Sequence, residues 1–223
     1  LEVQKKELSI TLPATEEDPY IPHISAVYGA TGDKAAVQGL LIWDTIGSYI
    51  TGIYNDEKLS FTIDTVYIAG FEGGNEELGI PDHLTLNGAT PVNDSDLTTL
   101  DAGTYLITVT ENSGNYTVAE GQFFVYGVTP ATLTVTGVTF EGGFNGVYDG
   151  QAHGVKVQFS GLIGDDTYNF IIMILDGEDQ IVDGNVVTNA GTYTVVAEAD
   201  SENTNYGDVT YENASGESMN EYT

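Results

Sequence analysis

The chain contains no cysteine and no arginine, and no apolar run reaches the roughly 18 residues of a membrane-spanning helix. Without thiols, neither a disulfide nor a thiolate-bound zinc ion can stabilise the fold. The first residues also lack the charged and then apolar layout of a signal peptide. We therefore expect a mature, soluble piece of a longer protein that inserts no segment into a membrane.

Positive charge is scarce. Five lysines face 34 acidic residues, which gives a formal net charge of −29. Such a field repels the phosphates of nucleic acids and anionic membrane surfaces, so we exclude both as partners. The acidity is typical of a solvated surface, and cation binding or residence in salty or extracellular surroundings are the functional interpretations. Apolar residues make up 41% of the chain, which is enough for a packed core.

One five-residue segment occurs twice. Residues 101–105 (DAGTY) return as residues 189–193 (NAGTY), and an alternating apolar run follows each copy. Glycine permits the turn, and the hydroxyl of the tyrosine can reach back to a main-chain group. This is the pattern of a tyrosine corner in an immunoglobulin-like sandwich, so the repetition predicts two β-domains.

Further matches divide the chain. The strand pattern at residues 8–12 returns at residues 133–135, and Asn115-Tyr116 returns as Asn205-Tyr206. We predict an all-β fold of two immunoglobulin-like sandwich units in tandem. The predicted domains are residues 1–129 with an insertion near residues 60–95, and residues 130–223. The chain is interpreted as a segment of a longer tandem array.

Local patterns predict individual elements. Residues 35–41 and 155–159 are predicted as strands, with Lys156 pointing outward because the apolar neighbours share the other face. Residues 71–96 are rich in Gly, Asn, Asp and Pro and are predicted to be mostly loop. Trp43-Asp44-Thr45 is matched with residues 164–168 of the second domain.

A set of short motifs in the second domain points to a family. In order they are residues 147–153 (VYDGQAH), 159–162 (FSGL), 164–168 (GDDTY), 189–193 (NAGTY) and 205–206 (NY). This order resembles the MBG (mucin-binding) and YDG repeats of bacterial surface adhesins, and the first domain resembles their VYG variant. Trp43 and the long insertion depart from the family pattern.

The resemblance implies an extracellular protein, secreted or attached to the bacterial cell wall. Its repeats would form a stalk with neighbouring repeats of the same chain, or contact host or environmental glycans, including mucin-type glycoproteins. A carbohydrate-binding module of a secreted enzyme is the alternative. A glycoside hydrolase that uses two carboxylates is a third hypothesis, because that chemistry needs only a pair of acids.

No catalytic or metal-binding motif stands out. The three histidines are scattered, and no phosphate-binding loop or nucleophile elbow occurs. We therefore expect no enzyme, no cofactor and no metal, although the pairs Asp94/Asp96 and Asp165/Asp166 offer oxygen ligands of the type calcium prefers. The candidate ligand-binding residues are aromatic side chains in or near loops that could stack on sugars: Tyr20, Tyr49 and Tyr54.

Overall fold

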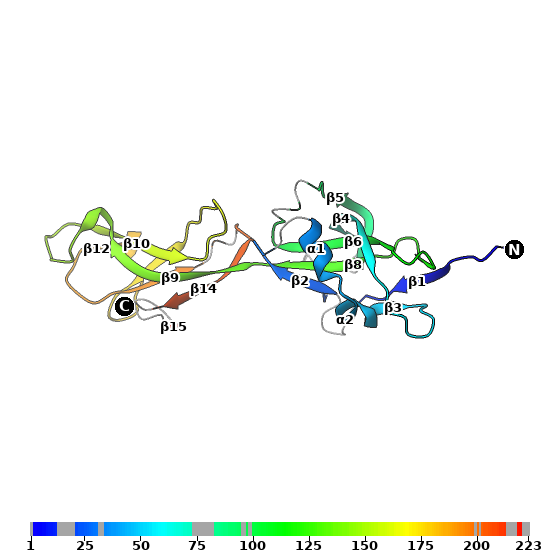
Figure 1. Ribbon diagram of the computed structural model, residues 1–223. Coiled ribbons are helices and arrows are strands. Elements are labelled where there is room, and N and C mark those ends of the chain that lie inside the picture. The colour runs from blue at the N-terminus through cyan, green and yellow to red at the C-terminus, as the bar shows by residue number, and fades with distance from the viewer. Residues whose placement is uncertain are drawn as a thin grey trace. The chain divides into compact units, whose positions relative to one another are not determined.

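The computed structural model describes residues 2–12, 21–30, 34–72, 83–94, 97, 100–198, 200, 202–212 and 218–219. Strands dominate its regular structure, which confirms the predicted all-β class (Figure 1). The chain folds into two compact units, Leu1–Thr129 and Pro130–Thr223, which we call unit one and unit two. In the described ranges, every helix is too short or too polar to cross a membrane.

The described part of unit one contains two sheets, two short α-helices and a 3-10 turn. Its described elements are β1 (Lys6–Ile10), β2 (Ile24–Val27), α1 (Lys34–Leu40), α2 (Trp43–Ile46), η1 (Gly47–Tyr49), β3 (Ile50–Thr51), β4 (Phe61–Glu72), β5 (His83–Pro91), β6 (Gly103–Glu111), β7 (Tyr116–Val118) and β8 (Phe124–Thr129). One sheet has the order β3-β1-β7 and the other β2-β8-β6-β4-β5. Leu8, Ile46, Leu106, Ile107 and Phe124 are fully buried and form part of the core.

Unit two is built from strands and short 3-10 turns. Its described elements are β9 (Ala131–Phe140), η3 (Glu141–Gly143), β10 (His153–Ser160), β11 (Ile171–Leu175), η4 (Asp183–Asn185), β12 (Val186–Val187), β13 (Thr194–Glu198), β14 (Tyr206–Glu212) and β15 (Ser218–Met219). One sheet has the order β12-β10-β9-β14-β15, and the other joins β11 to β13. Leu133, Val135 and Ile174 are fully buried in this unit.

Alternation sets the faces of β10, as the sequence predicts. Val155 and Val157 are buried, whereas Lys156 and Gln158 are exposed. Successive side chains of a strand point to opposite faces, so one face packs on the core and the other meets water. The predicted outward direction of Lys156 is therefore confirmed.

The strand predicted at residues 35–41 is wrong, because this segment forms α1. Lysine, alanine and glutamine in this stretch favour a helix, and Val37 supplies its buried contact. Gln38 then takes the place of a neighbouring strand. Its Nε2 donates to the carbonyl of Phe61 at 2.6 Å, and its Oε1 accepts the N–H of Ile63 at 2.8 Å. A helix therefore satisfies part of the β4 edge.

The predicted loop at residues 71–96 is also partly wrong. β4 extends through Glu72, and β5 pairs with it in antiparallel fashion from His83 to Pro91. The register shifts between Ile68 and Gly70, so a bulge interrupts the ladder and hides the strand pattern from a reading of the sequence.

Two glycines occupy the same local position in the two units. Gly52 has φ +92° and Gly161 has φ +103°, a region that side chains rarely adopt. A Cβ on Gly52 would lie 2.4 Å from the carbonyl oxygen of Glu7, and one on Gly161 would lie 2.6 Å from that of Thr132. The structure thus matches Gly52 of unit one with Gly161 of unit two. The predicted match of Trp43 with residues 164–168 is corrected, because Trp43 lies in α2.

Candidate functional site

Both units contain the hydrogen bond of a tyrosine corner. The hydroxyl of Tyr105 donates to the carbonyl of Asp101 at 2.8 Å, and that of Tyr193 donates to the carbonyl of Asn189 at 2.8 Å. The predicted reach of each hydroxyl to the main chain is confirmed. In unit two this bond fixes Tyr193 beside residues 189–191, which form one wall of the hollow described below.

A second tyrosine contact also occurs in both units. Tyr116 donates to Glu57 Oε2 at 2.5 Å and accepts the N–H of Tyr54 at 3.2 Å. Tyr206 donates to Asp166 Oδ2 at 2.6 Å and accepts the N–H of Ile163 at 2.9 Å. Each hydroxyl closes a loop by binding its carboxylate and the amide three residues earlier.

The three tyrosines predicted from the sequence have different surroundings. Tyr20 lies outside the described residues. Tyr49 is partly buried and meets the ring of His23 edge to face, with centroids 4.7 Å apart. Tyr54 is 62% exposed, and Lys6 Nζ lies 6.0 Å from the centre of its ring. Tyr49 therefore serves packing, and Tyr54 is the exposed aromatic side chain.

Tyr54 borders an open hollow of about 430 Å³ in unit one, beside Tyr116 and Lys6. The hydroxyl of Tyr116 is already bound to Glu57, and Tyr54 presents the one well-exposed ring of the described wall. A single ring with a nearby ammonium group offers one stacking contact. Unit two brings several aromatic rings together around one hollow.

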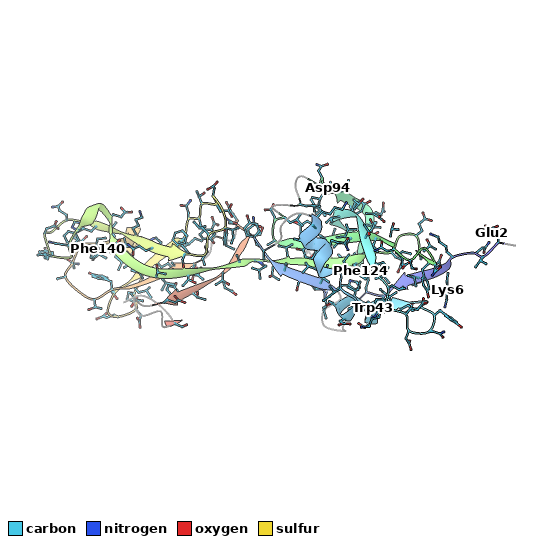
Figure 2. All side chains as sticks on the ribbon, viewed as in Figure 1. Glu2, Lys6, Trp43, Asp94, Phe124 and Phe140 are labelled. Carbon is cyan, nitrogen blue, oxygen red and sulfur yellow. The ribbon has the colours of Figure 1, made fainter. Side chains whose placement is uncertain are left out.

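A hollow of about 260 Å³ lies where β9 ends and β10 begins in unit two. We call it the aromatic hollow and define it by Phe140, Phe144, Tyr148, Asp149, His153 and Tyr193. Figure 2 labels Phe140, the last residue of β9, on its strand. The rings come from β9, from the turn that follows it, from β10 and from the tyrosine corner.

The rings in this hollow support one another. Phe144 stacks on His153 with centroids 3.5 Å apart and planes 5° from parallel. Phe140 meets Phe144 edge to face at 5.2 Å. Tyr148 is 64% exposed and leaves its ring open to solvent. The result is an aromatic wall that is fixed on one side and accessible on the other.

One carboxylate gives the hollow its polar group. Asp149 Oδ1 lies 2.9 Å from His153 Nε2 and accepts the N–H of Gln151 at 2.8 Å. A carboxylate only accepts, so Nε2 of His153 carries the proton. The hydrogen bond from His153, followed by that from Gln151, holds the pKa of Asp149 below its ordinary value. Asp149 is thus a fixed acceptor with open lone pairs.

Of the four candidate calcium ligands, two have other partners, one lies outside the described residues, and Asp165 is exposed in the loop before β11. Asp94 forms an ion pair with Lys34 at 3.4 Å, and Asp166 accepts the hydroxyl of Tyr206. Asp96 lies outside the described residues. Within the described ranges, no cluster of three or more His, Asp or Glu side chains is arranged to hold a metal ion.

Sequence reasoning misses the aromatic hollow as a site. Residues 147–153 carry the family resemblance, yet Tyr148, Asp149 and His153 are not among the residues predicted to bind a ligand. Their meeting with Phe140 and Tyr193 depends on the folded sheets. No family model, curated protein or solved structure matches the chain.

Proposed function

We propose that this chain is a non-enzymatic adhesion module of a bacterial cell-surface protein and that it binds glycans in the aromatic hollow. The observation that carries the proposal is the meeting of Phe144, Tyr148 and His153 around one concave surface with the carboxylate of Asp149 at its edge. Apolar rings with a few convergent polar groups are typical of ligand sites.

Sugar chemistry fits these groups. A pyranose has a face of C–H bonds and a rim of hydroxyls. The face of an aromatic ring is electron-rich and attracts the C–H bonds, and Tyr148 offers such a face to solvent. Asp149 accepts charge-assisted hydrogen bonds from sugar hydroxyls, while His153 holds the carboxylate in place.

The charge of the protein narrows the ligand class. At a net charge of −29, the surface repels sialylated and sulfated glycans at long range. Neutral glycans or glycans with amino groups experience no such repulsion. We therefore infer that neutral hexose or hexosamine residues are the preferred ligands.

The proposal also covers the fold of each unit and the relation between the two units. We infer that each unit is an immunoglobulin-like sandwich and that the two are tandem repeats of the MBG and YDG type. Three features that occur in both units support this: the corner bond of Tyr105 and Tyr193, the tyrosine–carboxylate contact of Tyr116 and Tyr206, and the strained glycines.

A glycan array with the full chain tests the function. We expect binding to neutral glycans, weaker binding to their sialylated forms, and about a tenfold loss of affinity for Tyr148→Ala, which corresponds to about 1.4 kcal/mol of lost stacking. The matched control is Val147→Ala, since Val147 is 65% exposed but does not line the hollow.

Three results would contradict the proposal. Equal glycan binding by Tyr148→Ala and the parent chain would remove the hollow as the site, and Tyr54→Ala would then test the hollow of unit one. If no glycan on the array binds the chain, the adhesive function is wrong and the function that remains is that of a stalk. Release of chromophore from aryl glycosides would overturn the non-enzymatic assignment.

A further inference from the structure

Among the described residues, the outer edge of β13 has no partner strand near its beginning. In the described ranges β13 pairs only with β11. Further along, the hydroxyl of Tyr211 accepts the N–H of Ala197 at 2.9 Å and donates to its carbonyl at 2.8 Å. Tyr211 thus occupies the edge that faces away from β11.

The direction of these two groups fixes that of Val195. In an antiparallel sheet, both main-chain groups of one residue point to the same side, and every second residue repeats that direction. The N–H and C=O of Val195 therefore point away from β11, as those of Ala197 do. No described residue caps Val195 in the way that Tyr211 caps Ala197.

An apolar groove of about 330 Å³ runs beside this edge. We call it the strand groove and define it by Val138, Phe140, Val155, Val187, Tyr193 and Val195. Its wall shares Phe140 and Tyr193 with the aromatic hollow. An open strand edge above an apolar groove is the arrangement that accepts an added strand, because the ladder and the groove are satisfied together.

Unit one shows what fills the corresponding place. β4 pairs with β6 as β11 pairs with β13, and a corner tyrosine introduces both β6 and β13. In unit one, β8 covers the outer edge of β6, with Tyr105 opposite Tyr126 and Ile107 opposite Phe124. Phe124 and Tyr126 are 0% exposed, so both side chains are buried in the core.

The chain carries no such segment at the corresponding distance in unit two. β8 begins eight residues after Tyr116, and the residues at the same distance from Tyr206 are 214–219 (ASGESM). In place of Phe124 and Tyr126 this stretch has alanine and glycine. Among the described residues, β15 at Ser218–Met219 pairs with β14 and not with β13. Residues 214 and 216 therefore offer no large apolar side chain like those of Phe124 and Tyr126.

We propose that the β13 edge and the strand groove bind an extended segment of a partner polypeptide that resembles β8. The partner strand runs antiparallel to β13 and has large apolar or aromatic side chains at alternate positions. One of them lies opposite Val195 and the next opposite Tyr193, as Phe124 and Tyr126 lie opposite Ile107 and Tyr105 in unit one.

Amide hydrogen exchange of the full chain, followed residue by residue by NMR, tests whether the edge is open. The amide of Ile107, on the covered strand β6, is the internal control for the amide of Val195. We expect Val195 to exchange at least about 100-fold faster than Ile107, since exposed edge amides open without unfolding. Protection of Val195 equal to that of Ile107 at all protein concentrations would show that the chain covers its own edge.

A labelled peptide with the sequence of residues 122–129 (QFFVYGVT) tests the occupant by fluorescence anisotropy. We expect saturable binding to the full chain, slower exchange of the Val195 amide, and loss of binding when the phenylalanine and tyrosine at positions 124 and 126 of the peptide are both aspartate. The Tyr148→Ala chain should bind the peptide normally, which separates this site from glycan binding.

A substitution in the full chain provides a second test of peptide binding at this edge. Val195→Pro removes one outward N–H, and proline is tolerated at a strand edge where the N–H does not serve the ladder. We expect no peptide binding with an unchanged NMR spectrum for unit one. Equal binding of the parent and aspartate peptides would overturn the proposal. Protection of Val195 that rises with protein concentration, together with a dimer in sedimentation, would show that a second copy is the occupant.

Discussion

The hydroxyl of Tyr206 lies 2.6 Å from Asp166 Oδ2 and joins β14 to the loop that precedes β11. The same hydroxyl accepts the N–H of Ile163 at 2.9 Å. Tyr116 makes the matching pair of bonds with Glu57 and Tyr54 in unit one. A buried tyrosine thus fastens a loop to the sheet in each unit, and the asparagine before it gives its carbonyl to the first strand of that unit.

Removal of either hydroxyl should destabilise its own unit. Tyr206→Phe and Tyr116→Phe each lose a hydrogen bond to a carboxylate, so we expect a loss of about 1.5–3 kcal/mol in the free energy of unfolding. Urea unfolding of the full chain measures it. Tyr148→Phe is the matched control for unit two, because its ring is 64% exposed. Unchanged midpoints for both variants would contradict the fastening role.

The strained glycine of unit two should resist substitution. Gly161→Ala places a Cβ 2.6 Å from the carbonyl oxygen of Thr132 in a backbone region with φ +103°. We expect a loss of more than about 1 kcal/mol, since the native conformation is incompatible with a side chain. Gly177→Ala is the control, because a Cβ there would meet no atom within 4 Å. Equal stability of the two variants in urea would refute the strain.

Acid should weaken unit one through His23. The ring is 4% exposed, its Nδ1 accepts the N–H of Val125 at 2.8 Å, and its Nε2 donates to the carbonyl of Thr11 at 3.0 Å. Burial lowers the pKa of His23 below 6.5, against the smaller opposing effect of the bond to Thr11. Between the lowered pKa and about 6.5, the unfolded chain binds a proton that the folded chain does not.

The stability due to His23 is therefore complete above about pH 6.5 and falls as the pH drops toward its folded pKa. We expect urea midpoints of unit one to decrease from about pH 7.5 to about pH 5.5, an interval that spans the ordinary histidine pKa. His23→Gln can still accept and donate one hydrogen bond each but does not titrate, so its midpoint should change less over this interval. An equal slope in parent and variant would show that other groups cause the loss.

Alkaline pH should weaken unit one by ionising Tyr105, whose hydroxyl binds the carbonyl of Asp101. Burial, then the charge of Asp101 and the neighbouring Tyr126, raises the pKa of Tyr105 to about 12. The unfolded tyrosine ionises near 10, so the stability due to the protonated hydroxyl is complete below about pH 10 and is lost toward pH 12. Tyr105→Phe should cost about 1 kcal/mol at neutral pH, the net worth of one hydrogen bond.

Tyrosinate absorbance during a pH titration measures this directly. The parent should show one tyrosine that ionises near pH 12 and that is missing in Tyr105→Phe. Tyr193→Phe makes the corresponding change in unit two and should cost about the same stability, since its hydroxyl makes the same bond. If neither variant moves its urea midpoint, the corner bonds do not contribute to stability.

Salt should stabilise the whole chain. At a net charge of −29 the folded protein repels itself, and most of this repulsion is screened at about 0.15 M sodium chloride, where the Debye length is about 8 Å. We expect the melting temperature to rise smoothly to that concentration. Calcium and magnesium at matched ionic strength should give similar melts. A rise of several degrees with calcium alone, abolished by Asp165→Asn, would reveal a calcium site.

Several features of this protein follow from local sequence. The alternation around Lys156 determines which side of β10 meets water, and the repeated turn before Tyr105 and Tyr193 determines where a hydroxyl returns to the main chain. Both are short-range effects, because a strand alternates with a period of two and a corner bond spans four residues. The acidic composition likewise sets the repulsion between this protein and anionic partners.

Other features depend on contacts between residues far apart in the chain. Gln38 lies in a helix, and its side chain binds the edge of β4. The propensities of residues 35–41 carry no information about that edge, because it lies elsewhere in the chain. The aromatic hollow joins Phe140, Tyr148 and Tyr193 only after three segments have folded together. The outer edge of β13, which has no partner among the described strands, likewise depends on the whole sheet. A strand can be recognised from local sequence, whereas its pairing is known only once the ladder has formed.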